Sequence, residues 1–163
     1  MVAASDTSPI SNLALIGRLE LLRVQFGEVW IPGAVKRELD RLPSPEGRAS
    51  IKQAMQAGWL RCRDIANAPL AAVLANDLDE GEAEAIALAT EIPADVLLID
   101  EKDGRALARQ AGVPVRGVLG ILIRAKAMGS VSSVKPEIEA LRRLAGFFVA
   151  TNLEEEVLRS IGE

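Results

Sequence analysis

The sequence predicts an α/β fold in which helices flank a central, mainly parallel sheet. Short apolar segments alternate along the chain with segments of helical periodicity, which is the pattern of successive β-α units. The clearest strand, Val96–Ile99, is a continuous apolar run of the kind that parallel sheets bury on both faces. Apolar residues make up 49% of the chain and aromatic residues 3%, so we expect a core of Leu, Ile, Val and Ala.

The first part of the chain is expected to form three strands and four helices. The expected strands are Val2–Ala4, Glu28–Ile31 and Leu60–Cys62, and the expected helices are Pro9–Leu15, Leu19–Phe26, Pro32 to about Leu42, and Arg48–Ala57. Ser8 is the expected N-cap of the first helix, with Pro9 at the first helical position. The Pro-Ser-Pro sequence at residues 43–45 is expected to stop the third helix.

The second part continues the alternation and ends in a helical extension. Residues 67–76 are ambiguous between loop and helix. The expected helices are Glu80–Thr90, Lys102–Ala111, Val118–Met128, Pro136–Leu144 and Leu153–Ile161, and the expected strands are Val96–Ile99 and Val113–Val115. We expect one domain over residues 1–163, with a core over about 1–130 and C-terminal helices over about 131–163.

Cysteine usage and the N-terminus indicate a cytoplasmic setting. The lone Cys62 cannot form an internal disulfide, which fits a reducing compartment. The first residues lack the basic and apolar regions of a signal peptide. No apolar run approaches the roughly 20 residues that a membrane span needs.

Charge is distributed unevenly. The net charge is −4, but residues 77–103 contain ten acids and one base, a local charge of −9, which leaves +5 on the remainder. An acidic pocket beside a mildly basic remainder is compatible with nucleic-acid binding, and a bound divalent metal would reverse the local sign.

Four acids stand where the pattern of a helix or strand would normally place an apolar residue: Asp6, Glu38, Glu82 and Asp100. The chain has no histidine and one cysteine, which nearly excludes chemistry at nitrogen or sulfur. Clustered carboxylates hold hard cations such as Mg2+ or Mn2+. Such an ion polarises a phosphate and activates a water molecule, so the acids predict metal-assisted chemistry on a phosphate.

Asp6 and Asp100 each follow an expected strand, which is where ligands bind in open α/β sheets. Asp6 lies two residues too early to cap a helix that Ser8 caps. Asp100 has a plainer alternative, a capping arrangement with Asp103 at the start of the next helix. Glu101 beside it leaves the identity of the ligand at this position open.

Glu38 lies between Val35 and Leu42 on a helical wheel, within the apolar stripe of its helix. An unpaired carboxylate is costly to bury, which favours a functional role. The alternative is an ion pair with a neighbouring base, for which Arg41 at i+3 is the best placed.

Glu82 shares a helical face with Ala85, Ile86 and Ala89, whereas Glu84 points roughly opposite. The alternative for Glu82 is an acid in a first helical turn, where the helix dipole favours negative charge. Glu84 is expected to be solvated. The second-tier site candidates are Glu84, Glu101 and Asp103.

Three arginines are candidates for contacts to backbone phosphates: Arg37, Arg105 and Arg109. The alternative is that these arginines are simply solvated, as most surface arginines are. No Walker loop, Gly-rich dinucleotide fingerprint or zinc spacing is present.

Taken in order, these motifs resemble the PIN-domain nucleases, and more narrowly a PIN-like subgroup of prokaryotic proteins of the toxin type. The segments that carry the likeness are Asp6-Thr7-Ser8-Pro9, Val35-Lys36-Arg37-Glu38-Leu39, Gly81-Glu82-Ala83-Glu84-Ala85, Leu97-Leu98-Ile99-Asp100-Glu101 and Gly117-Val118-Leu119-Gly120. The resemblance covers nearly the whole chain.

The resemblance implies a PIN fold, an acidic pocket that binds Mg2+ or Mn2+, and endoribonuclease activity that leaves a 5′-phosphate and a 3′-hydroxyl. By position, Asp6, Glu38, Glu82 and Asp100 match the acids of the family. Many members have Asp where this chain has Glu82. Many also have Thr-x-Asp where this chain has Ile99-Asp100-Glu101, so Glu101 stands as an alternative to Asp100.

The expected function is that of a metal-dependent endoribonuclease, the toxin of a type II toxin–antitoxin pair, with RNA as substrate and an antitoxin as partner. A homodimer is also expected. The chain has two nearly uncharged apolar stretches, residues 66–74 and 147–149, and if the core buries only one of them, the other is exposed and available as an interface. The alternative is a non-catalytic PIN-like regulator that binds RNA or a protein. A phospho-receiver is disfavoured, because its acceptor Asp, paired acids and lysine are not found together.

Overall fold

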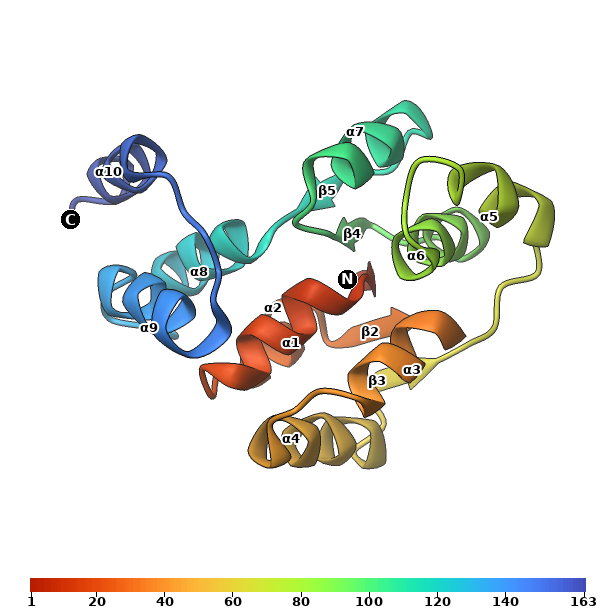
Figure 1. The fold of residues 1–163 in the computed structure, drawn as a ribbon. Coiled ribbons are helices and arrows are strands. Elements are labelled where there is room, and N and C mark those ends of the chain that lie inside the picture. Colours follow the sequence, from red (N-terminus) through yellow and green to blue (C-terminus); the bar gives the residue numbers. More distant parts are fainter.

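The computed structural model describes residues 1–163, along which strands and helices alternate (Figure 1). The strands are β1 (Val2–Ser5), β2 (Glu28–Ile31), β3 (Leu60–Cys62), β4 (Val96–Leu98) and β5 (Val115–Arg116). The helices are α1 (Thr7–Leu15), α2 (Glu20–Phe26), α3 (Gly33–Asp40), α4 (Pro45–Gln56), α5 (Ala68–Leu74), α6 (Glu80–Glu91), α7 (Lys102–Gln110), α8 (Val118–Ala127), α9 (Lys135–Ala145) and α10 (Thr151–Ser160). None of these helices has both the length and the hydropathy to cross a membrane.

All five strands are parallel and lie in the order β3-β2-β1-β4-β5, which confirms the predicted α/β fold. The chain adds β2 and β3 on one side of β1 and then crosses to add β4 and β5 on the other side. Ser5 of β1 is in register with Leu98 of β4, so the carboxyl ends of these two strands lie side by side. The strand order reverses between β1 and β4, and ligands of open α/β sheets bind at such a switch point.

Two apolar clusters cover the two faces of the sheet, because successive strand residues point in opposite directions. Ala3 and Leu98 belong to the larger cluster, which includes residues of α1, α2, α8 and α9. Ala4 and Leu97 belong to the smaller cluster, which includes residues of α6 and α7. Figure 1 shows α8 and α9 to the left of β4, and α5 and α6 to its right. The clusters are overwhelmingly aliphatic, as predicted.

Four helices begin earlier than the sequence pattern predicts: α1 by two residues, α4 by three, α9 by one and α10 by two. Helix α1 starts at Thr7 rather than Pro9, so Asp6 and not Ser8 takes the N-cap position, although the Asp6 side chain makes no capping hydrogen bond. Helix α4 starts at Pro45 rather than Arg48. The Gly47 N–H donates a hydrogen bond of 3.0 Å to the Ser44 hydroxyl, and proline suits a first helical turn. The Pro-Ser-Pro sequence therefore ends one helix and begins the next.

Smaller differences concern a helix and a strand. Residues 68–74 of the ambiguous segment form α5, whose first turn is capped by the Asn67 side chain, which accepts a hydrogen bond of 3.1 Å from the Leu70 N–H. Strand β5 lies at Val115–Arg116 rather than at residues 113–115. The C-terminal helices pack on the larger cluster through Ile138, Leu141 and Leu158.

Candidate active site

The carboxyl ends of β1 and β4 place Asp6 and Asp100 at the switch point of the sheet. The Asp6 N–H donates a hydrogen bond of 2.9 Å to the carbonyl of Leu98, which extends the β1–β4 pairing by one residue. Asp100 follows two residues after Leu98. The expectation that each acid follows a strand is confirmed, and the topology adds that the two strands are parallel neighbours.

Gly81 allows the start of α6 to approach both α3 and the end of β1. A methyl group built on Gly81 would collide with the Glu38 carboxylate and would lie 3.4 Å from Asp6 Oδ1. Asp6 and Glu38, which lie far apart in the sequence, therefore meet at the start of α6. A side chain at residue 81 would displace at least one of them.

Asp6 and Glu82 are the buried acids of this site, with 4% and 8% of their surface exposed. Burial raises the pKa of Asp6 to about 7, and the charges of Asp79, Glu38 and Asp100 add to the rise. Burial also raises the pKa of Glu82 to about 8, with the charges of Asp79 and Asp6 adding to it. Both carboxyl groups therefore resist ionisation unless a positive charge joins them.

Glu38 is exposed, so its predicted place within a buried stripe is wrong. Ala34, Val35 and Leu39 form the buried side of α3, and Glu38 lies at the margin of that side. It also makes no ion pair with Arg41. Its Oε2 instead accepts a hydrogen bond of 2.7 Å from the Thr7 hydroxyl, which holds the carboxylate toward the start of α1.

Both carboxylate oxygens of Asp100 accept hydrogen bonds. The Ser8 hydroxyl donates to Oδ2 and the Val118 N–H donates to Oδ1, each at 2.8 Å. Asp100 thus caps the start of α8 rather than α7, whose N-cap position is occupied by Glu101. Burial raises the pKa of Asp100, while the hydrogen bonds from Val118 and Ser8 act in the opposite direction.

The second-tier acids lie in different surroundings. Glu84 is half-buried rather than simply solvated as the sequence predicts, because its Oε1 accepts a hydrogen bond of 3.2 Å from the Ala34 N–H at the start of α3. Glu101 and Asp103 are exposed. The charge of Glu101 contributes to the raised pKa of Glu82.

Asp79 is an acid of the site that the sequence analysis misses. It is the N-cap of α6, where its Oδ1 accepts a hydrogen bond of 2.8 Å from the Glu82 N–H. Its charge also contributes to the raised pKa values of both Asp6 and Glu82. The signal was present, since an acid three residues before Glu82 at a helix start is a capping pattern.

The three candidate arginines are not equivalent. Arg37 is paired with Glu80 at 3.0 Å across the α3–α6 contact. Arg105 and Arg109 instead line a hollow of about 590 Å³ that includes Asp100, Lys102, Arg116 and Phe148. We call this hollow the basic groove.

The donor set at the switch point fits a hard divalent cation in its chemistry. It consists of carboxylate oxygens, with the Thr7 and Ser8 hydroxyls beside them. A cation would also relieve the crowding that raises the pKa values of Asp6 and Glu82. As the side chains lie, no group of three acids could hold one ion, so binding would have to draw carboxylates together.

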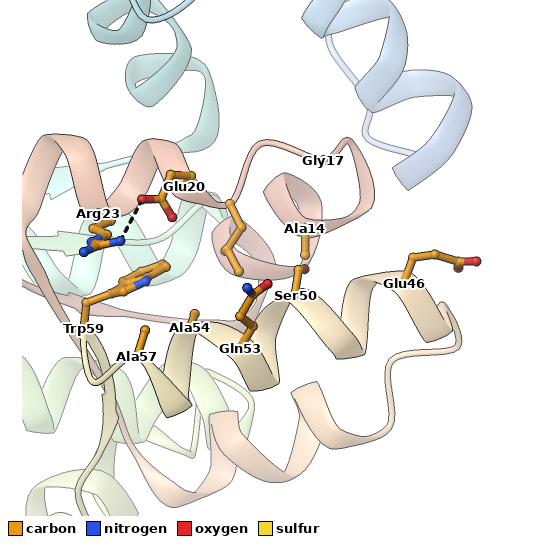
Figure 2. A pocket seen from close by; sticks show the side chains of 11 residues that line it. Ala14, Gly17, Glu20, Arg23, Glu46, Ser50, Gln53, Ala54, Ala57 and Trp59 are labelled. Atoms are coloured by element: carbon orange, nitrogen blue, oxygen red, sulfur yellow. Dashed lines mark hydrogen bonds and ion pairs between the residues drawn. The ribbon is translucent and has the colours of Figure 1, made fainter.

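A second hollow, of about 350 Å³, lies between α1, α2 and α4 (Figure 2). Trp59 lines it just before the amino end of β3, whereas the acids follow the carboxyl ends of β1 and β4. Because the strands are parallel, this hollow lies toward the opposite edge of the sheet from the acids. Figure 2 shows Glu20 and Arg23 directed toward each other at its rim.

The family of the chain follows from its sequence profile. The profile described as a PIN domain matches residues 2–163. The chain belongs to the PIN-domain family. PIN domains are generally nucleases and typically bind divalent metal ions, so this chain has a nuclease-type fold. The resemblance to the PIN-domain family is confirmed.

A solved structure is similar to this PIN domain. It is a PilT N-terminus domain protein from the hyperthermophilic archaeon Sulfolobus solfataricus P2, with 22% sequence identity and a TM-score of 0.56. The match covers 77% of this chain and 93% of that one. At this identity the similarity supports the fold alone. No curated protein shows significant sequence similarity to the chain.

Proposed function

We propose that this PIN domain is a metal-dependent endoribonuclease that hydrolyses RNA phosphodiesters and acts as the toxin of a type II toxin–antitoxin pair. The observation that carries the proposal is the pair of buried acids, Asp6 and Glu82, crowded by Glu38, Asp79 and Asp100 at the switch point. Strongly perturbed carboxylates in a ligand-binding position are characteristic of functional sites.

Each acid has a distinct role in the proposal. Asp6, Glu82 and Asp100 would be the principal ligands of Mg2+ or Mn2+, and Glu38 would hold a second ion or orient a water molecule. Asp100 is already oriented by Ser8 and Val118, and Glu38 by Thr7. When bound, the ion would polarise the phosphate and activate water. With no histidine in the chain, carboxylates are the natural acceptors of any proton moved at this site.

A cleavage assay tests the catalytic proposal. Wild type with Mn2+ or Mg2+ should cut a labelled single-stranded RNA, and excess EDTA should stop the reaction. Glu82→Gln should lose cleavage while remaining folded, whereas Glu139→Gln, on the exposed side of α9, should cleave like wild type. RNA left intact by wild type at millimolar Mn2+ would contradict the proposal.

A second candidate is the non-catalytic PIN-like regulator. No group of three acids is arranged to hold an ion. This observation favours a site that binds without cutting. The same assay separates the candidates, because a regulator would retain RNA or a protein partner and leave RNA intact with every metal.

The proposed partners are an antitoxin, a second copy of the chain and RNA. Both apolar stretches expose a large side chain, Val73 with 64% and Phe148 with 85% of its surface exposed. Light scattering at micromolar concentration should show a dimer mass, and a clean monomer mass would contradict it. Purification of the protein from its native host should also recover a small protein partner. If no partner is recovered, and cells that overexpress the protein grow without restraint, the toxin role is contradicted.

A further inference from the structure

The basic groove begins at the acid site and extends to the C-terminal segment. Asp100, an acid of the switch point, is one of the residues that line it. Its walls come from α7, β5, the start of α8, and α10 with the residues before it. A polymeric ligand bound along the groove would therefore pass beside the proposed reaction centre.

The lining of the groove carries four positive charges against one acid, Asp100, whose pKa burial raises and the Arg105 charge acts to lower. Lys102, Arg105, Arg109 and Arg116 make no ion pair in the structure. Asp100 is the one acid among the lining residues. The local charge is thus opposite to that of the acid site next to it, and its ligand should be an anion.

Arg116 strengthens this inference because its positive charge is poorly compensated. Its Nη1 is buried without a hydrogen-bond partner, and its guanidinium lies 5.7 Å from the centroid of the Phe26 ring. Burying an unpaired polar group of this kind is costly. Burial, with the nearby charge of Arg124, lowers the pKa of Arg116, so this wall of the groove carries positive charge that nothing in the protein compensates.

Phe148 supplies the second feature of the groove. It is the most exposed large apolar side chain of the protein, with 85% of its surface accessible, whereas Val149 beside it is buried in the core. Val149 thus anchors the backbone while the Phe148 ring stays accessible. Cationic side chains beside an exposed aromatic ring are the combination that binds single-stranded nucleic acid, with phosphates on the cations and a base stacked on the ring.

We propose that the basic groove binds single-stranded RNA next to the acid site, with phosphates on Arg105 and Arg109 and an unpaired base stacked on Phe148. The choice of RNA rests on the proposed endoribonuclease function. An unpaired base is required because bases inside a duplex are already stacked on their neighbours. The groove would therefore select unpaired RNA as the substrate.

Binding and cleavage are tested separately. Anisotropy of a fluorescein-labelled single-stranded RNA is measured in EDTA with wild type, Phe148→Ala and Phe148→Tyr, and a duplex of the same length serves as the second probe. Phe148→Ala should weaken single-strand binding by roughly tenfold, the scale of one lost base–aromatic stack, while Phe148→Tyr retains it. Duplex binding should change by less than about twofold.

Two further variants locate the charges and control for exposure. Arg109→Ala should weaken single-strand and duplex binding alike and lower the slope of log affinity against log salt by roughly one. Val73→Ala, which removes a comparably exposed apolar side chain on α5, should bind like wild type. Melting temperatures of all variants should match wild type, because each altered side chain is exposed.

Three outcomes would overturn the proposal. These are single-strand binding unchanged in Phe148→Ala, an equal loss for single strand and duplex in that variant, or an oligoglutamate peptide that displaces RNA and binds more tightly. Similar affinity for single-stranded DNA is expected, because the proposed contacts do not involve the 2′-hydroxyl, whereas cleavage of single-stranded DNA and not of RNA would overturn the assignment to RNA. If RNA binding depends on Phe148 but the protein cuts no RNA, the basic-groove proposal is supported and the endoribonuclease proposal is contradicted. If the protein cuts RNA but its RNA binding does not depend on Phe148, the endoribonuclease proposal is supported and the basic-groove proposal is contradicted.

Discussion

Two carboxylates of this protein, Asp6 and Glu163, are held in opposite ways. Glu163 accepts hydrogen bonds from the Lys126 ammonium at 2.6 Å, the Ser133 hydroxyl at 2.8 Å and two backbone N–H groups at the start of α9. These partners, Lys126 first, lower the pKa of Glu163 to about 2. Burial and neighbouring acids instead raise the pKa of Asp6 to about 7. Four donors stabilise the charged form of Glu163, whereas at Asp6 burial and neighbouring acids outweigh the one backbone hydrogen bond that it accepts from Thr7.

Asp100 lies between these two cases. It is largely enclosed like Asp6, yet it accepts two hydrogen bonds from the protein as Glu163 does. One group therefore serves both the packing of α8 and the acid site. The comparison shows which acids cost stability, and buried acids kept at such a cost are the better candidates for function.

The largest expected effect concerns cleavage. Asp6→Asn should lower the rate of RNA cleavage by about 10²–10³-fold, the scale of losing one electrostatic contributor from an active site. Glu163→Gln should leave the rate near that of wild type, because its contacts lie at α9 and not at the acids. Single-turnover cleavage with Mn2+ measures both. Equal losses in the two variants would erase the distinction between the site acid and the structural acid.

The next effect concerns metal-dependent stability. A cation that binds the folded chain should raise its melting temperature by mass action, and a concentration of about 100 times Kd corresponds to roughly 2.7 kcal/mol. For a chain of this size that is on the order of 5–10 °C. Thermal melts with EDTA and with millimolar Mn2+ measure the shift. Asp6→Asn should reduce it and Glu163→Gln should not, whereas no shift in wild type would contradict the metal site.

The third effect is a pH dependence of stability, which has opposite signs for the acids of the switch point and for Glu163. The pKa of Asp6 rises from 3.8 to about 7 on folding, and that of Glu82 from 4.5 to about 8. Their contribution to stability is therefore fully present below about pH 4 and is lost as the pH rises toward 8. The contribution of Glu163, whose pKa falls from 4.5 to about 2, is lost only as the pH falls through that range.

Urea unfolding in EDTA at pH 5 and pH 8 measures this dependence. Wild type should be less stable at pH 8, and Asp6→Asn should be the more stable chain there by on the order of 2–4 kcal/mol. At pH 5 the difference between the two chains should shrink. A wild type that gains stability from pH 5 to pH 8 would contradict the crowding of acids at the switch point.

The fold and the acids that follow strands could be predicted because they depend on local pattern. The apolar run before Asp100 and the alternation of elements fix a parallel sheet, and a parallel sheet fixes where Asp6 and Asp100 lie. The burial of Glu82 followed from its helical face. The exposure of Glu38 could not be predicted in this way. Glu38 lies at the edge of the apolar side of its helix, and only the packing of α3 decides whether a residue at that edge is buried or exposed.

Long-range contacts account for what the sequence analysis left out. The hydrogen bond from Val118 to Asp100 joins residues 18 apart, and the bond from Thr7 to Glu38 joins residues 31 apart. No periodicity encodes such pairs. The basic groove likewise combines α7 with a C-terminal segment that pattern alone cannot place. Asp79 is different, because its capping pattern was visible in the sequence.

The smallest expected effect concerns the structural acid alone. Glu163→Ala removes the partner of two backbone N–H groups at the start of α9 and of the Lys126 ammonium. We expect faster hydrogen exchange at the start of α9 and through α10, with little change in β1 and β4, because the contacts of Glu163 do not reach the sheet. Glu155→Ala, an exposed acid of α10, is the matched control. Hydrogen exchange read by mass spectrometry should separate the two variants. Faster exchange in β1 and α6 of Glu163→Ala would show that the chain end and the acid site are coupled, and that their opposite pKa shifts belong to one cooperative unit.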